Sequence, residues 1–155
     1  MQKSTLRSLA LLALISTTSA LADSIGFRAG APFGLQYTID NGFGRGKDLR
    51  LAAQFNTFFG EAYGQIQADI MLGRKTLGDN RDLSLFYGLG PHVRFVTSNA
   101  LAMGGQGTLG LEYQIDKRFS VFADTSVGIS IWTTKYLGNT MTTYYGGAFG
   151  VNYKL

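Results

Sequence analysis

The amino-acid sequence predicts an all-β protein of eight antiparallel strands, and three observations support this fold class. Apolar residues recur at every second position along most of the chain, as at Leu109, Leu111, Tyr113 and Ile115, which is the period of a strand with two different faces. Clusters of Gly, Asp and Asn separate the alternating runs and are typical of turns. Beyond the N-terminal region, no segment keeps a helical period. The 155 residues are enough for one domain.

Residues 1–22 have the three parts of a secretory signal peptide. Two basic residues supply the positive start, and LALLALI over residues 9–15 is a short apolar core. This core is too short for a membrane-spanning helix, which needs about 20 residues. The A-x-A pattern ending at Ala22 is one that signal peptidase accepts, so we expect cleavage between Ala22 and Asp23. The predicted mature domain is therefore residues 23–155.

The N-terminal half of the mature chain contains four alternating runs. Ala31-Pro32 breaks the period between the first two. If the chain is not split there, the first two runs form one strand and the total is seven. A turn rich in Gly, Asp and Asn (DNGFGRG, residues 40–46) follows the second run, and a charged loop (RKTLGDNRD, residues 74–82) follows the fourth. The predicted strands are residues 24–30, 33–39, 48–59 and 61–72.

The C-terminal half contains four longer runs. Pro91 lies within the first of them and is expected to weaken the hydrogen-bonded ladder locally. A tight charged turn joins the second and third runs, and a polar and aromatic loop over residues 133–140 joins the third and fourth. The predicted strands are residues 83–97, 102–115, 118–131 and 142–155.

The residues of the two faces indicate that the apolar face contacts lipid. Charged residues make up 15% of the chain, whereas about 25% is usual in soluble domains, and lysine is almost absent from the polar face. Several apolar-face positions hold only Gly or Ala, which would leave a soluble core underfilled. Aromatic residues collect near strand ends, as at membrane interfaces. We therefore expect an up-and-down transmembrane β-barrel, with eight strands because bacterial single-chain barrels have even strand numbers.

Arginines and carboxylates balance in the middle of the strands, on the polar face. An enclosed interior requires such balance, because burying an unpaired charge is costly. In an eight-stranded barrel, side chains fill the interior; a narrow polar pore or ligand pocket along the same residues is the alternative. We predict an interior ion network formed by Arg28, Arg50, Asp69, Arg94, Glu112 and Asp124.

The C-terminal segment GAFGVNYKL has apolar or aromatic residues at Phe149, Val151, Tyr153 and Leu155. With the signal sequence and the Gly-rich hairpins, it makes the mature chain resemble the small eight-stranded outer-membrane barrels of the OmpA/OmpX-like superfamily. The resemblance implies a location in the cell outer membrane, contact with its lipid, and recognition of the last strand by the barrel-assembly machinery. The family's usual final Phe is Leu155 here.

The motifs that could bind a cofactor, a metal or nucleic acid are incomplete or lack the structural context they need. GQGTLG (residues 105–110) fits G-x-G-x-x-G but lies inside a predicted strand with no following helix. His92 is the only histidine and has no cysteine to join it as a metal ligand. The mature chain has a net charge of only +2, after two of the +4 charges leave with the signal, and no basic cluster interleaved with aromatics. We expect no cofactor, metal or nucleic-acid partner.

Part of the chain resembles the site of the outer-membrane lipid A deacylases, which are eight-stranded barrels that use His, Ser and Glu. The chain contains Ser98 followed by Asn, and Glu112 further on, but Val96 stands where that family has its histidine. Without an adjacent base, Ser98 is a poor nucleophile, and His92 lies four residues earlier. We therefore expect a protein that is not an enzyme.

The sequence thus predicts a structural or surface protein of the outer membrane with a packed polar interior. The alternative is a soluble periplasmic or secreted β-barrel that binds an apolar ligand and has the opposite faces inside and outside. The loops at residues 30–33, 59–62, 97–103 and 132–141 would be extracellular. Residues 132–142 (WTTKYLGNTMT) are the candidate site for an extracellular partner, whose identity the sequence leaves open.

Overall fold

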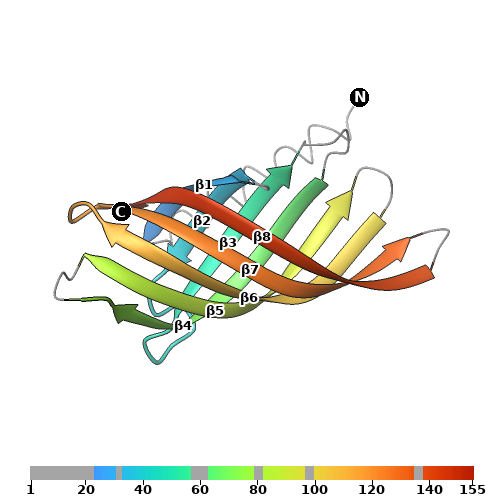
Figure 1. Ribbon diagram of the computed structural model, residues 1–155, viewed down its shortest axis with the longest axis horizontal. Coiled ribbons are helices and arrows are strands. Elements are labelled where there is room, and N and C mark those ends of the chain that lie inside the picture. Colours follow the sequence, from blue (N-terminus) through green and yellow to red (C-terminus); the bar gives the residue numbers. More distant parts are fainter. Residues whose placement is uncertain (1–22, 31–32, 57–62, 79–81, 97–99, 135–137) are drawn as a thin grey trace.

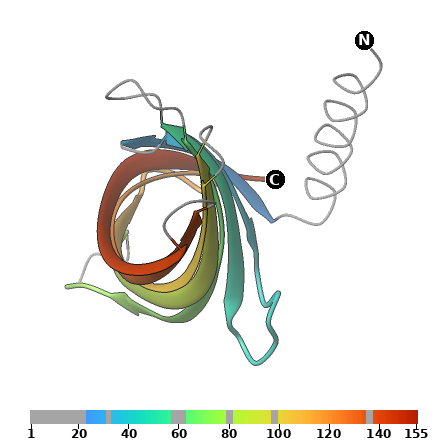
Figure 2. The same cartoon turned by 90° about the vertical axis from the view of Figure 1, so that its right-hand side faces the viewer.

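The computed structural model describes residues 23–30, 33–56, 63–78, 82–96, 100–134 and 138–155. These residues form one closed antiparallel sheet, in which strands pair in sequence order and the first pairs with the last (Figure 1). The sheet curls into a ring when seen along its axis (Figure 2). The strands are β1 (Ser24–Gly30), β2 (Phe33–Ile39), β3 (Asp48–Asn56), β4 (Tyr63–Thr76), β5 (Leu83–Val96), β6 (Ala100–Gln114), β7 (Phe119–Thr134) and β8 (Gly138–Lys154).

The prediction of an all-β fold with eight antiparallel strands is confirmed. The first two alternating runs are separate strands that pair with each other, from Ser24 with Thr38 to Arg28 with Gly34. No helix among the described residues is long and apolar enough to span a membrane. The predicted signal peptide and the Ala31-Pro32 break lie outside the described residues, as do parts of the other predicted loops.

The charged loop predicted over residues 74–82 is partly wrong, because β4 continues to Thr76. Arg74 pairs with Phe86 and Thr76 with Ser84 on β5. The register between β4 and β5 shifts between Met71 and Gly73. An extra residue at such a bulge reverses the alternation of faces, which hides the continuation of the strand from a pattern with a period of two.

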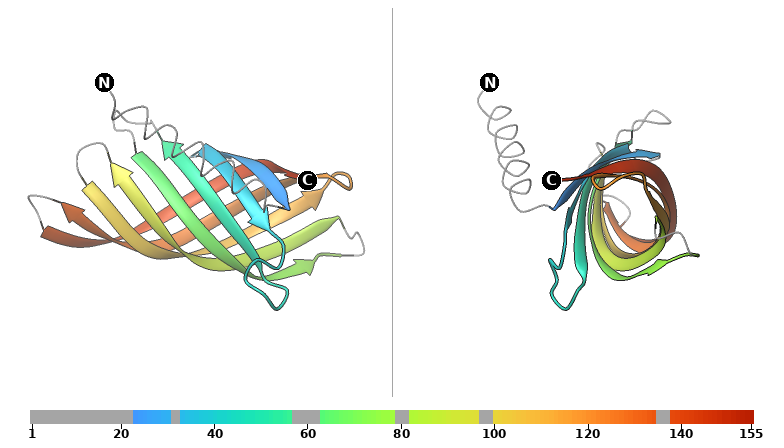
Figure 3. Two further views of the ribbon diagram at one scale, coloured as in Figure 1. Left: turned by 180° about the vertical axis from the view of Figure 1, so that it is seen from behind. Right: turned by 90° about the vertical axis from the view of Figure 1, so that its left-hand side faces the viewer.

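The loops predicted over residues 97–103 and 133–140 are also shorter than expected. β6 begins at Ala100, and the β7–β8 hairpin keeps its register as far as Thr134 opposite Gly138. Its outer part extends beyond the neighbouring strands (Figure 3). Trp132 contributes to this extension, because its Nε1 donates a 2.9 Å hydrogen bond to Oγ1 of Thr142. The described part of residues 132–142, the candidate site for an extracellular partner, therefore belongs mainly to the β-hairpin of β7 and β8.

Pro91 interrupts one ladder, as predicted. The paired positions of β4 and β5 pass from Gln67 with His92 directly to Ile70 with Leu89. On its other side β5 stays in register with β6, and Pro91 lies opposite Gly105. The missing amide hydrogen of proline therefore weakens β5 on one side only.

Apolar and polar side chains occupy the reverse of their usual places. Among the described residues, seventeen polar or charged side chains are buried, but only six hydrophobic ones. Large apolar side chains point outward from every strand and are exposed, such as Leu89 (55%), Ile131 (52%) and Phe149 (65%). Exposed apolar residues of this extent are unusual for a soluble monomer, in which apolar patches are small.

The start of β1 and the end of β8 lie at one end of the barrel, here called the terminal end. Asp23 donates its amide to the Thr38 carbonyl, and Leu155 donates its amide to the Asp23 carbonyl, at 2.9 and 3.0 Å. Lys154 forms a surface ion pair of 3.7 Å with Asp40. Partial burial, with the nearby charge of Asp48, raises the pKa of Asp40 above its usual value. The β2–β3 and β6–β7 connections lie at this end, with the last residues of β4 and the first residues of β5, and the opposite end of the barrel is called the far end (Figure 1).

Candidate functional site

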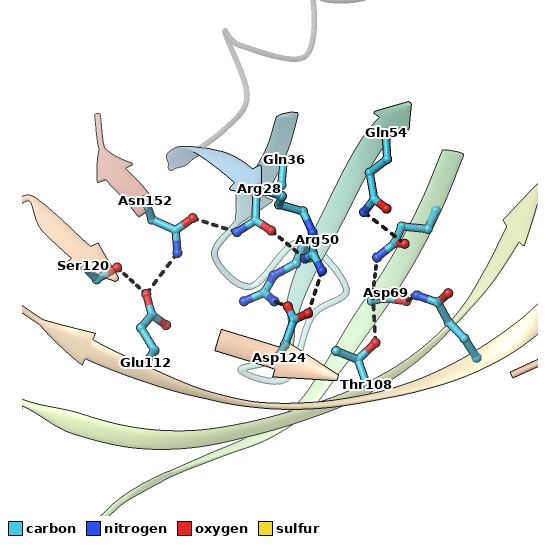
Figure 4. Close-up of polar contacts among 12 residues, drawn as sticks. Arg28, Gln36, Arg50, Gln54, Asp69, Thr108, Glu112, Ser120, Asp124 and Asn152 are labelled. Carbon is cyan, nitrogen blue, oxygen red and sulfur yellow. Dashed lines mark hydrogen bonds and ion pairs between the residues drawn. The ribbon is translucent and has the colours of Figure 1, made fainter. Parts of the chain in front are cut away.

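The predicted ion network lies inside the ring, on six different strands from β1 and β3 to β7. Alternation places these side chains inward, because neighbouring residues on the same strands point outward. Five of the six are buried, with exposed fractions from 0% for Asp69 to 8% for Asp124, and Arg94 is half-buried. The structure therefore places all six in the interior, and it divides them into separate groups (Figure 4).

Arg28, Arg50 and Asp124 form the central group. Nη2 of Arg28 contacts Oδ1 of Asp124 at 2.6 Å, and Nη1 of Arg50 lies 3.6 Å from Oδ2 of the same carboxylate. Nη1 of Arg28 also donates to Oε1 of Gln36 at 3.0 Å. All three charged side chains are almost completely shielded from solvent. One carboxylate thus compensates two guanidinium groups in an enclosed space.

Two aromatic rings complete the surroundings of Arg50. Its guanidinium carbon lies 4.5 Å from the ring centre of Phe86 and 5.8 Å from that of Phe122. These rings occupy space left by inward-facing glycines, because a Cβ atom on Gly110 would overlap the Phe86 ring and one on Gly150 would overlap the Phe122 ring. The attraction between a desolvated cation and an aromatic face supplements the shared carboxylate. The sequence pattern alone did not identify Phe86 and Phe122 as interior residues.

Glu112 belongs to a second group nearer the terminal end. Its Oε2 accepts a 2.7 Å ion pair from Nη2 of Arg74, and its Oε1 accepts hydrogen bonds from Ser120 and from Nδ2 of Asn152. Asn152 in turn accepts a 2.6 Å hydrogen bond from Gln36, which joins this group to the central one (Figure 4). Arg74 was missed because it falls in the predicted loop.

Asp69 is compensated by neutral donors. Oδ1 accepts from Nε2 of Gln106 at 2.9 Å, and Oδ2 accepts from Nε2 of Gln67 at 3.0 Å and from Oγ1 of Thr108 at 3.3 Å. No arginine or lysine of the described residues lies within ion-pair distance of it. Gln54 extends the chain of amides through Gln67.

Arg94 occupies the half of the interior towards the far end. Its guanidinium lies 3.5 Å from the ring centre of Tyr144, and its Nε donates to Oε1 of Gln65 at 2.7 Å. The buried His92 packs edge-on against the same ring and makes a 2.7 Å hydrogen bond between Nε2 and Oγ of Ser130. Among the described residues, Arg94 therefore has no carboxylate partner.

The structure separates His92 from Glu112, two of the residues considered for a deacylase-like site. His92 lies opposite Gly104 on β6, which places it eight positions along that strand from Glu112. Eight strand residues correspond to roughly 26 Å. Ser98 lies outside the described residues. No group of three or more metal-binding side chains occurs among the residues that the structure describes.

Of the four C-terminal residues proposed for recognition, three lie along the outer side of β8, and Leu155 follows the end of that strand. Phe149, Val151 and Leu155 are exposed, and Tyr153 is half-buried. The hydroxyl of Tyr153 accepts a 3.0 Å hydrogen bond from Nη1 of Arg118, and its ring packs against a neighbouring phenylalanine. The set lies beside the seam where β8 pairs with β1 and closes the barrel.

A scan of the sequence against protein-family models and a search of curated proteins return no match.

Proposed function

We propose that this chain is an outer-membrane β-barrel protein with a packed polar interior, which serves as a structural or surface membrane protein and not as an enzyme. One observation carries the proposal: a closed barrel exposes large apolar side chains around its outside and buries polar and charged ones within. In a bilayer this arrangement is favourable, because the apolar band faces lipid and closure pairs the backbone groups of every strand.

The alternative, a soluble barrel that binds an apolar ligand, requires an apolar interior. The described interior instead contains arginines, carboxylates and glutamines, and its few buried hydrophobic residues include Phe86 and Phe122, which pack against Arg50. An apolar ligand would meet charged groups there and would have to displace an ion pair. These contacts favour the membrane proposal.

The pore alternative requires an open path along the barrel axis. Arg50, Phe86 and Asp69 are among the largest fully buried side chains, and they come from different strands. Arg28 also approaches Phe122, with 5.5 Å between its guanidinium carbon and the ring centre. Such cross-barrel packing supports a filled interior, as expected for eight strands. Purified protein in a planar bilayer should accordingly show no conductance above background.

The proposed route to the membrane uses both ends of the chain. Residues 1–22 direct export and are removed, and the barrel-assembly machinery recognises the last strand through Phe149, Val151, Tyr153 and Leu155. The exposed apolar side chains of this set support the second step, since they are accessible on the outer side of β8. The terminal end of the barrel would then face the periplasm, and the far end the exterior.

In the first experiment, the full chain is expressed and the membranes are washed with carbonate. Detergent extracts of these membranes are then compared by gel electrophoresis with and without boiling. We expect the protein to stay in the membrane fraction and to change mobility only on boiling, because a closed hydrogen-bonded barrel resists detergent until it is heated. Release into the soluble fraction without a mobility change would contradict the proposal and favour the soluble barrel.

A further inference from the structure

The loop between β2 and β3, residues 40–47 (DNGFGRGK), has an exposed aromatic residue at its tip. Phe43 is 60% exposed and has a glycine on either side. The loop, cyan in Figure 2 and Figure 3, extends sideways from the ring at the terminal end and away from the barrel axis. The loop that contains Phe43 therefore extends outside the circumference of the barrel.

The loop has a defined conformation that its own backbone supports. The amide of Phe43 donates to the Lys47 carbonyl, and the amide of Lys47 donates to the Gly44 carbonyl, both at 3.1 Å. The amide of Asn41 donates to Oδ1 of Asp48 at 3.1 Å. These bonds hold the tip without requiring the Phe43 ring to pack against the barrel. The aromatic side chain is thus held in an outward position.

Two basic residues accompany the ring, and one of them occupies an unfavourable backbone position. Arg45 has φ of 55°, between Gly44 and Gly46, which both have φ of 74°. A residue with a Cβ atom is uncommon in this left-handed region, so a third glycine would relieve strain but remove the charge. Neither Arg45 nor Lys47 forms an ion pair with any residue that the structure describes.

We propose that the β2–β3 loop binds the surface of the periplasmic leaflet, with Phe43 at the boundary between headgroups and acyl chains. Arg45 and Lys47 contact the phosphates of anionic phospholipids. The inference rests on the proposed membrane location of the barrel. An aromatic ring is favourable at that boundary, basic side chains can reach phosphates while their stems stay in apolar surroundings, and anionic lipid attracts basic segments near a membrane surface.

A single-tryptophan experiment tests the position of the loop. The chain has one tryptophan, so Trp132→Phe provides a background for three reporters: Phe43→Trp in the loop, Leu89→Trp on the outer face, and Lys117→Trp in the β6–β7 turn. Each folded variant, verified by its boiling-dependent mobility, is reconstituted into phosphatidylcholine vesicles with phosphatidylglycerol. Lipids brominated near the ester carbonyl or deeper in the acyl chain then measure the depth of the indole.

We expect the loop reporter to have blue-shifted emission and to be quenched most by the shallow bromines, and the Lys117→Trp reporter to fluoresce as in water. A loop reporter that matches Lys117→Trp would overturn the inference while quenching of Leu89→Trp still showed the barrel in the bilayer. Absence of quenching at Leu89→Trp would instead contradict the membrane proposal, and the inference with it.

The role of the charges is tested by Arg45→Asn with Lys47→Gln in the loop-reporter background. Asparagine tolerates the left-handed backbone, so the loop conformation should persist. We expect quenching of the unmodified loop reporter to increase with the fraction of phosphatidylglycerol, and this dependence to be lost in the double variant. An unchanged dependence would contradict the assignment of Arg45 and Lys47 to anionic lipid.

Discussion

At the scale of single residues, Asp124 is the most demanding position of the interior. Its carboxylate contacts Arg28 and lies near Arg50, and all three side chains are shielded from solvent. Removal of one partner from a buried ion pair is costly, because the remaining charge keeps its desolvation penalty. Here the loss of one carboxylate would leave two arginines uncompensated.

We expect Asp124→Asn to lower the free energy of unfolding by about 3–5 kcal/mol, the range typical of broken buried pairs. Asp40→Asn, which removes a half-exposed ion pair with Lys154, is the matched control and should cost about 0–1 kcal/mol. Urea unfolding in lipid vesicles, followed by the boiling-dependent gel shift, measures both. Equal effects of the two variants would show that the central group does not stabilise the barrel.

Glycines on the two faces of the barrel should respond differently to the same substitution. A Cβ atom on inward-facing Gly110 would lie 2.7 Å from Cβ of Asp124 and would overlap the Phe86 ring, whereas on outward-facing Gly105 it would meet only the Gly90 carbonyl at 4.0 Å. We expect Gly110→Ala to cost about 1–3 kcal/mol through overpacking, and Gly105→Ala to be neutral or stabilising. The same unfolding assay compares them, and similar costs would contradict the assigned faces.

At the scale of elements, the β6–β7 turn shows how a side chain supports a tight connection. Oδ1 of Asp116 accepts hydrogen bonds from the amides of Arg118 and Phe119, at 2.7 and 2.8 Å. These bonds lower the pKa of the Asp116 carboxyl below its usual value of 3.8. The hairpin formed by β6 and β7 is one of the longest in the barrel, with fifteen paired positions.

We expect Asp116→Ala to destabilise the barrel at neutral pH and to have less effect in acid. A lowered pKa means that the carboxylate stabilises the folded state above pH 3.8, and that this contribution is lost as the pH falls through the pKa of the folded protein. Unfolding of wild type and variant at neutral pH and below pH 3.8 tests this. A difference that persists unchanged in acid would show that the ionised carboxylate is not responsible.

At the scale of the whole molecule, the reversed distribution of apolar and polar side chains is the property from which the proposed function follows. The outer face exposes leucine, isoleucine and phenylalanine along the strands, while the inner face holds several polar groups, two of which are joined by the hydrogen bond from Gln36 to Asn152. Water on the outside would leave the apolar band without a partner, and lipid would provide one. A substitution on the outer face therefore distinguishes the two solvents.

We expect Leu89→Arg, in the middle of β5, to cost about 2–4 kcal/mol in a bilayer. Leu111 lies nearer to the terminal end of the barrel. Leu111→Arg should therefore cost less, since the penalty for arginine on the lipid face falls towards the membrane interface. If water surrounded the barrel with these same faces, both side chains would be exposed to it, and both variants would be nearly neutral. A soluble barrel with the opposite faces would bury both leucines, and both variants would be strongly destabilised. Unfolding free energies of the two variants in vesicles decide between these outcomes.

The sequence by itself predicted eight strands, with the split at Ala31-Pro32 decided by the even strand number of bacterial barrels, and it determined most of the membership of the two faces. A strand repeats every two residues, so local alternation is enough to separate Leu111 from Glu112 and to place Arg28, Arg50 and Asp124 on the same side. It did not reveal the continuation of β4 past Leu72, because the bulge after Met71 reverses the alternation.

Only the tertiary structure decided which inward residues meet. Arg28 and Asp124 are far apart in sequence, and Arg50 packs against Phe86 and Phe122 from strands that are not its neighbours. These contacts cross the lumen, so they depend on closure of the ring and on the stagger of its strands. A local sequence pattern contains no information about either property. The charge balance of the interior is therefore a property of the composition, and its pairing is a property of the closed barrel.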